Sequence, residues 1–165
     1  MNTPDPNPDA GLPPEPNEPK RAEPAVEADS RFPSGPWTGF FLQPGLTGRQ
    51  WMELHLTFRA GTLRGEGRDV VGKFLIVGRY DVSDGKCWWT KRYLGRHDIA
   101  YSGYNEGKGV WGMWEDPKNS TWRGGFRIWP EAMGDPYALR VAEEVDVPAS
   151  VDLEISTPAE ELAPV

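Results

Sequence analysis

The side chains with the most chemical capacity are an aspartate, a lysine and three tyrosines that the strand pattern places on one face. Alternate residues of a strand point the same way. This alternation predicts that Asp69, Lys91, Tyr80, Tyr93 and Tyr101 all face the core. A buried charge is tolerated when it is paired and hydrogen-bonded. An Asp69–Lys91 pair ringed by tyrosine hydroxyls would meet that condition.

Two interpretations of this group remain open. In the first, a bulge shifts the alternation of the strand, or the pair lies at the solvent-filled mouth of a β-barrel and only closes it. In the second, the group orients a small ligand in the barrel mouth, where such sites occur, and Trp89 and Trp114 form an aromatic wall beside it. The second interpretation predicts a ligand-binding site, with no cofactor, that consists of Asp69, Tyr80, Trp89, Lys91, Tyr93, Tyr101 and Trp114.

Other chemistry finds little support in the residue pattern. The chain has two histidines, His55 and His97, and shows no Ser–His–Asp arrangement, metal-ligand spacing or phosphate-binding loop. The lone Cys87 excludes an intramolecular disulfide framework and a thiolate zinc site. We therefore expect no catalytic and no metal-binding residues. An enzyme that works through Asp69, Lys91 and the tyrosines is the remaining catalytic option.

The elements that must position these side chains are short β-strands. Residues 73–114 hold four runs rich in aromatic and β-branched residues, separated by turns that contain Gly, Asn and Asp. Residues 51–59 alternate apolar and polar side chains. Short connections and repeated mid-strand glycines favour an all-β, eight-stranded antiparallel up-and-down barrel. The eight expected strands are residues 37–43, 51–59, 62–69, 73–81, 86–94, 97–104, 110–115 and 121–129.

Charge divides the 165 residues into three parts. Residues 1–33 hold seven acids and three bases, residues 34–130 nine and fourteen, and residues 131–165 nine and one. We expect a barrel domain at 34–130 between two acidic, largely disordered tails. The first tail could be a spacer or an arm that competes for the basic barrel, and the second could dock as a short helix or edge strand. No secretory signal or membrane span is visible, so a cytoplasmic location is expected.

A series of short motifs follows one another along the strands: Gly35-Pro-Trp37, Gly61-Thr-Leu-Arg-Gly65, Gly78-Arg-Tyr-Asp81, Trp88-Trp89, Tyr101-Ser-Gly-Tyr104 and Trp114. Their order resembles that of the avidin/streptavidin family and, more broadly, of calycin-type barrels. The resemblance implies an eight-stranded barrel over residues 35–129. It does not imply biotin binding, because Gly39 stands where the family has an asparagine, and the last-strand aspartate and the hydroxyl-rich sixth strand have no counterparts. Each lost partner would cost about 1–3 kcal/mol.

The outer face of the barrel offers a second kind of site. Outward arginines alternate along the strands, and Trp88, Trp111 and Trp129 are expected to point outward with them. The charge density is modest, so we do not expect nucleic acid as a partner, nor a membrane. We expect a binding protein with an unknown small molecule at the barrel mouth. The alternative is a protein-interaction module that uses the outer Trp/Arg wall and the acidic tails to bind a partner or a second copy.

Overall fold

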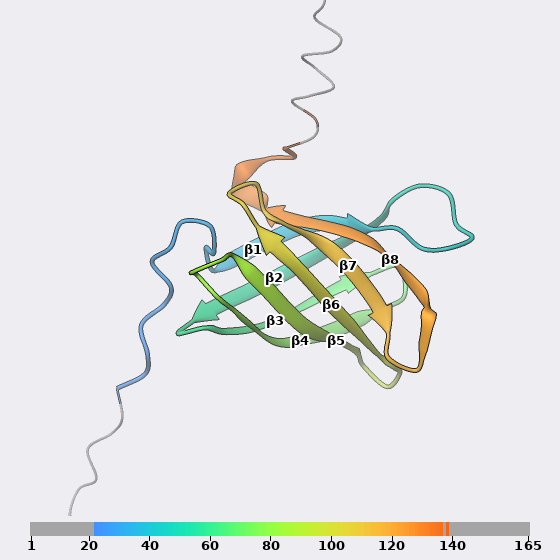
Figure 1. Ribbon diagram of the computed structural model, residues 1–165, viewed down its shortest axis with the longest axis horizontal. Helices are drawn as coiled ribbons and strands as arrows, with labels where there is room; N and C mark the ends of the chain where they lie inside the picture. The colour runs from blue at the N-terminus through green and yellow to red at the C-terminus, as the bar shows by residue number, and fades with distance from the viewer. Residues whose placement is uncertain (1–21, 137, 139–165) are drawn as a thin grey trace, which may run out of the picture.

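The computed structural model describes residues 22–136 and 138, and eight antiparallel strands close into a barrel in sequence order (Figure 1). Each strand pairs with its sequence neighbours, and β1 pairs with β8 to complete the circle. The structure confirms the predicted all-β, up-and-down architecture. The strands are β1 (Gly35–Phe41), β2 (Gln50–Arg59), β3 (Thr62–Asp69), β4 (Lys73–Tyr80), β5 (Lys86–Tyr93), β6 (Asp98–Asn105), β7 (Val110–Asp116) and β8 (Asn119–Pro130), followed by the short 3-10 helix η1 (Glu131–Met133).

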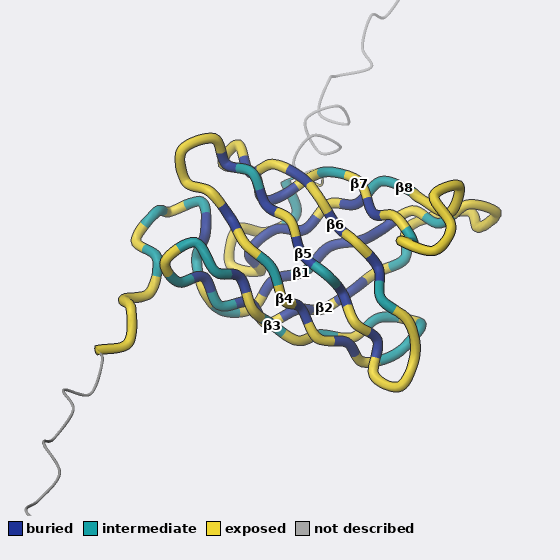
Figure 2. Tube along the Cα trace, turned by 60° about the horizontal axis from the view of Figure 1, so that its bottom comes forward, coloured by how far each residue is buried: buried dark blue, intermediate teal, exposed yellow. Residues whose placement is uncertain are grey.

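Buried and more exposed residues alternate along the strands, as the sequence predicts (Figure 2). In β2, Met52, Leu54, Leu56 and Phe58 are buried, and the residues between them are more exposed. In β5 the buried positions are Cys87, Trp89, Lys91 and Tyr93. Burial of apolar surface contributes about 25 cal/mol per Å². Side chains from all eight strands therefore form one core inside the barrel.

Two interior glycines show how so many aromatic rings fit. A Cβ atom on Gly67 would overlap the Phe74 ring, and one on Gly78 would overlap Trp89. Both glycines face a neighbouring strand that carries a large ring at the paired position. The missing side chains leave room for the Phe74 ring and for the Cβ atom of Trp89, because protein interiors pack with few voids.

The N-terminal segment closes one end of the barrel. Phe32 is fully buried against Phe58 and Tyr80, with ring centroids 5.4 and 4.8 Å apart. Ser34 Oγ accepts a hydrogen bond from the Phe58 backbone at 3.0 Å, and Val26 forms a bridge with Arg59. The sequence places residues 22–33 in the acidic tail, whereas the structure packs them on the barrel. One aromatic side chain in a proline-rich context is a weak signal, because its burial depends on a cavity that only the closed barrel provides.

The expectations for the outer parts of both tails, residues 1–21, 137 and 139–165, lie outside the described residues. Over the part of the chain that is described, no helix is long and apolar enough to cross a membrane.

Candidate functional site

Asp69 and Lys91 form an ion pair inside the barrel, near the end opposite Phe32. Lys91 is 1% exposed, and the side chain of Asp69 is fully buried. The Oδ2 atom of Asp69 accepts from Lys91 Nζ and, at 2.6 Å, from the Tyr93 hydroxyl. Its Oδ1 atom accepts from the backbone nitrogens of Val71 at 2.9 Å and Gly72 at 3.4 Å. The carboxylate therefore joins the interior of the barrel to the β3–β4 turn.

The ammonium group of Lys91 lies in a cage of aromatic rings. Its Nζ atom is 4.2 Å from the ring centroid of Phe74 and 4.9 Å from those of Phe41 and Tyr93. It is also 3.5 Å from the Tyr101 hydroxyl oxygen. Ring faces and a carboxylate are the groups that recognise organic cations in binding sites. Here the occupant is a side chain of the protein itself.

Burial governs the protonation of this group. Loss of hydration lowers the pKa of Lys91 to about 8, although the charge of Asp69 opposes that shift. Burial also raises the pKa of Tyr93 and Tyr101 well above the usual tyrosine range, and the Asp69 carboxylate adds to both shifts. At neutral pH the lysine is charged and the two phenols are neutral.

The polar atoms of this cluster already have partners within the protein. Among the described residues, no buried side-chain nitrogen or oxygen lacks a hydrogen-bond partner. A ligand could reach Lys91 or Asp69 only by displacing one of those partners, at a cost of about 1–3 kcal/mol for each group left unpaired. The geometry therefore supports the interpretation that the pair closes the mouth more strongly than the interpretation that it binds a ligand.

The other predicted site residues do not all join this cluster. Trp89 stacks on Tyr101 with ring centroids 5.3 Å apart, deeper in the barrel. Trp114 donates from its indole nitrogen to the Leu42 carbonyl at 2.9 Å, beside the mouth. Tyr80 lies at the closed end, where its hydroxyl donates to Glu27 at 2.6 Å. Strand alternation predicts which face a residue occupies, but not its height along the barrel. It therefore groups Tyr80 with Lys91, although the two lie at opposite ends.

The open mouth holds only a small recess, of about 40 Å³. That volume suits one or two water molecules, whereas sites for drug-sized ligands measure about 300–1,000 Å³. Strand alternation predicts that Phe41 and Ile99 face inward, and His97 is expected at the mouth or in a turn. The sequence pattern misses Gln43, Val71 and Trp122, because they come from turns or strand ends. The full lining is Phe41, Gln43, Val71, Tyr93, His97, Ile99, Tyr101, Trp114 and Trp122.

A cluster of large apolar side chains lies on the outer face of β5, β6 and β7. Trp88 is paired across the sheet with Ser102, and Ser102 with Met113. Tyr104 is paired with Trp111, and their ring centroids are 6.3 Å apart. These four large side chains are between 39% and 52% exposed. We call them the outer aromatic wall: Trp88, Tyr104, Trp111 and Met113.

The third predicted outward tryptophan is an exception. Trp129 is on the outer side of its strand, but it is only 2% exposed, because it packs against Phe40 and Trp51. The expectation that Trp129 belongs to an exposed outer Trp/Arg wall is therefore wrong. It belongs to a separate packed cluster over β1, β2 and β8. Tyr104 and Met113, which are not among the tryptophans expected in the wall, take its place there.

Basic side chains border the outer aromatic wall. Arg79 is paired across the sheet with Trp88, Lys86 with Tyr104, and Arg127 with Trp111. The Lys86 Nζ atom is 5.6 Å from the Trp88 ring. Cations at a protein surface attract acidic partners over a Debye length of about 8 Å at physiological salt.

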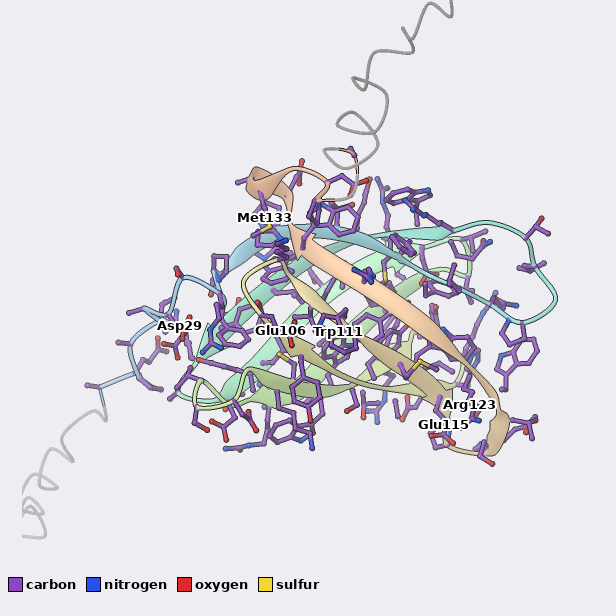
Figure 3. The ribbon with its side chains drawn as sticks, turned by 45° about the horizontal axis from the view of Figure 1, so that its top comes forward. Asp29, Glu106, Trp111, Glu115, Arg123 and Met133 are labelled. Atoms are coloured by element: carbon purple, nitrogen blue, oxygen red, sulfur yellow. The ribbon has the colours of Figure 1, made fainter. Side chains whose placement is uncertain are left out.

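A hollow of about 410 Å³ adjoins the wall where the chain leaves the barrel. Its lining includes Glu106, Lys108, Trp111, Arg127 and Pro136. Glu106 and Trp111, both labelled in Figure 3 with Met133, line this hollow together with Pro136, which follows Met133 closely in the chain. The hollow therefore connects the outer aromatic wall to the start of the C-terminal segment.

Another hollow lies on a different part of the outer face. It measures about 720 Å³ over β1 to β4 and is lined by side chains of both charge signs, among them Glu53, His55, Glu66, Arg68 and Lys73. Glu53 and Arg68 form an ion pair at 2.8 Å, with each side chain 69% exposed. Exposed pairs contribute about 0–1 kcal/mol. This hollow shows no group of buried, converging polar atoms.

Metal and thiol chemistry find no site in the described part of the chain. No group of three or more His, Cys, Asp or Glu side chains there is arranged to hold a metal ion. Cys87 is buried, and its burial raises the pKa of the thiol to about 12. A thiol at that pKa is a poor nucleophile.

Comparison with protein-family models, with curated proteins and with solved structures found no match. The fold defines the class of the protein as a closed, eight-stranded antiparallel β-barrel, an architecture compatible with an avidin-like or calycin-like fold. Any function must therefore be argued from the geometry of the chain itself.

Proposed function

We propose that this protein is a non-catalytic binding protein and that it binds other polypeptides through the outer aromatic wall. The observation that carries the proposal is that Trp88, Tyr104, Trp111 and Met113 adjoin one another on three neighbouring strands and remain half exposed. Tryptophan, tyrosine, methionine and arginine are the residues most enriched in protein interfaces. The interior, in contrast, is filled by its own side chains.

The wall also has the rigidity and charge that an interaction surface needs. Its side chains stand on paired strands, so little conformational entropy is lost when a partner binds. Arg79 and Lys86 at its border favour a partner that carries acidic residues beside its apolar ones. We infer a partner segment with both kinds of side chain.

Peptide selection on the immobilised full chain tests this proposal. Peptides selected from a random displayed library are measured against the wild type, a Trp88→Ser/Trp111→Ser variant and a Trp122→Ser variant. Trp122 is a matched control because its exposed fraction, 38%, is nearly the same as that of Trp88, whereas its position is at the mouth and not in the wall. We expect the wall variant to weaken binding about tenfold or more, which corresponds to about 1.4 kcal/mol, and the control to bind normally. Equal binding to all three chains would contradict the proposal.

A small-molecule site at the mouth is the second candidate function. The observation that favours it is the convergence of Gln43, His97 and the Tyr93 and Tyr101 side chains on the recess. The size of the recess restricts the ligand to a few atoms, or to the tip of a larger molecule.

Thermal unfolding of the full chain against a panel of metabolites that includes biotin tests this second candidate. A ligand that binds only the folded state raises its stability by about 2.7 kcal/mol at a hundredfold excess over Kd. We expect a small ligand to shift the midpoint of the wild type but not of a Gln43→Ala/His97→Ala variant. A panel without any shift would remove this candidate.

A relation to the avidin family and a cytoplasmic location stay proposals. The first is supported by the strand number and the motif order, and the second by the sequence features given above.

A further inference from the structure

The acidic end of the chain and the outer aromatic wall complement each other. We propose that residues 141–155 of the same molecule occupy the wall when no partner is bound. This inference rests on the proposed function, because it names an occupant for the same surface. It assigns to the C-terminal segment the task of competing with partners.

Charge is the first argument. Residues 139–165 hold seven acids and one base, whereas residues 34–130 hold nine acids and fourteen bases. None of the four large side chains of the wall is charged, and Arg79, Lys86 and Arg127 are paired with wall residues across the sheet. An acidic segment is therefore attracted to the border of the wall without meeting a like charge at its centre.

The order of residues in the segment is the second argument. Residues 151–155 read Val-Asp-Leu-Glu-Ile, a strict alternation of apolar and acidic side chains. In an extended chain, alternate side chains point to opposite sides. Such a segment can place Val151, Leu153 and Ile155 against the wall while Asp152 and Glu154 face the solvent or the basic border.

Proximity is the third argument. Pro136 lines the same hollow as Trp111, so the C-terminal segment starts at one edge of the wall. The wall covers three adjacent strands, a width of about 10 Å. An extended chain advances about 3.3 Å per residue, so residues 137–155 are long enough to cross it. A short tether also gives an effective concentration in the millimolar range, at which weak binding is populated.

The closed barrel restricts how the segment can bind. Every described strand pairs on both sides, so the barrel offers no free edge to which a ninth strand could be added. Binding must therefore use side chains on the outer face. An occupant must therefore contact the exposed rings of Trp88 and Trp111, whose signals can be used to detect it.

A spin label on the full chain tests the inference. We attach the label to Cys in a Ser156→Cys variant and record the indole N–H signals, assigned by Trp→Phe substitution. Cys87 is buried and has a raised pKa, so the label reacts selectively with the new cysteine. We expect strong broadening of the Trp88 and Trp111 signals and little change in the Trp122 signal at the mouth. A label on a Thr3→Cys variant is the control for unspecific contact.

Two further samples identify the occupant. In the labelled chain, Val151→Ser/Leu153→Ser/Ile155→Ser should restore the Trp88 and Trp111 signals, whereas Leu162→Ser, outside the proposed segment, should leave them broadened. Labelled chain mixed with isotope-enriched, unlabelled chain should show no broadening. Broadening in that mixture would assign the wall to a second copy and overturn the inference. Absence of broadening in the labelled chain, or broadening that persists in the triple variant, would overturn it as well.

The outcomes separate this inference from the proposed function. If selected peptides bind the wall but the label broadens no wall signal, only the inference fails. The opposite outcome is that the label broadens the wall signals but no peptide binds, even to the triple variant. The wall would then bind only the C-terminal segment of its own chain, and the proposed function would fail.

Discussion

The two ends of the barrel are closed by different physical means. At one end, the chain folds its own N-terminal segment over the opening and inserts Phe32 among other aromatic rings. At the other end, a buried Lys91–Asp69 pair joins the β3–β4 turn to the interior and leaves a recess of about 40 Å³. An apolar plug tolerates substitution by other apolar side chains, because it needs only a suitable volume and shape. A charged closure needs every partner in place, since an unpaired buried charge is costly.

The largest effect is expected at the charged end. Asp69→Ala leaves Lys91 without its counterion and leaves Tyr93 and two backbone N–H groups without an acceptor. We expect the free energy of unfolding, measured by denaturant titration, to fall by about 4–5 kcal/mol. A matched Asp69→Leu/Lys91→Met variant removes both charges and should lose much less. If the two variants are equally unstable, the charge is not what makes this end sensitive.

The apolar end should respond less strongly to a large deletion. Phe32→Ala removes a fully buried ring from between Phe58 and Tyr80. We expect a loss of about 3–4 kcal/mol, because the segment at the end of the barrel can relax into part of the cavity. Phe32→Leu should cost about half as much. A loss below about 1 kcal/mol in Phe32→Ala would show that the segment does not seal the barrel in solution.

The charged end should also give the stability of the protein a characteristic pH dependence. The pKa of Lys91 falls from about 10.5 in the unfolded chain to about 8 in the folded protein. Between these values the unfolded state binds more protons, so the Lys91 contribution makes the free energy of unfolding rise as pH increases from about 8 to about 10. Raised pKa values of Cys87 and Tyr80 act in the opposite direction above pH 9 and pH 10 respectively.

The difference between wild type and the Asp69→Leu/Lys91→Met variant reports chiefly on the lysine, because both chains keep Cys87, Tyr80, Tyr93 and Tyr101, whose pKa values are raised mainly by burial. We expect the stability of the wild type to gain on the order of 2 kcal/mol relative to that variant across this pH interval. Denaturant titrations at closely spaced pH values measure it. A flat difference would mean that Lys91 titrates at its ordinary pKa and is better hydrated than the structure shows.

The smallest effect is expected for the hydrogen bond between Tyr80 and Glu27 at the apolar end. Tyr80→Phe removes a hydrogen bond to Glu27, whose side chain reaches solvent, and keeps the ring packed on Phe32. We expect a loss of about 0.5–1 kcal/mol in denaturant unfolding. A loss as large as that of Asp69→Ala would erase the contrast between the two ends.

The candidate sites show how far residue patterns reach. Strand alternation predicts that Asp69, Lys91, Tyr93 and Tyr101 face inward, and the structure brings these four together. The same pattern places Tyr80 with them, although it lies at the opposite end. Trp129 is on the predicted side of its strand but is buried by Phe40 and Trp51. Alternation does not predict how far along the barrel axis a side chain lies. It also does not predict which residues of distant strands become its neighbours when the barrel closes.

The sequence by itself determined the strands, their turns, the inward and outward faces and the charge division of the chain, because these follow from local backbone preference and a two-residue period. Only the tertiary structure decided that Phe32 seals one end, that the charged pair is satisfied from within, and that Tyr104 and Met113 complete the outer aromatic wall. These features depend on register around a closed barrel, where residues far apart in the chain become neighbours through β1–β8 pairing and loop closure.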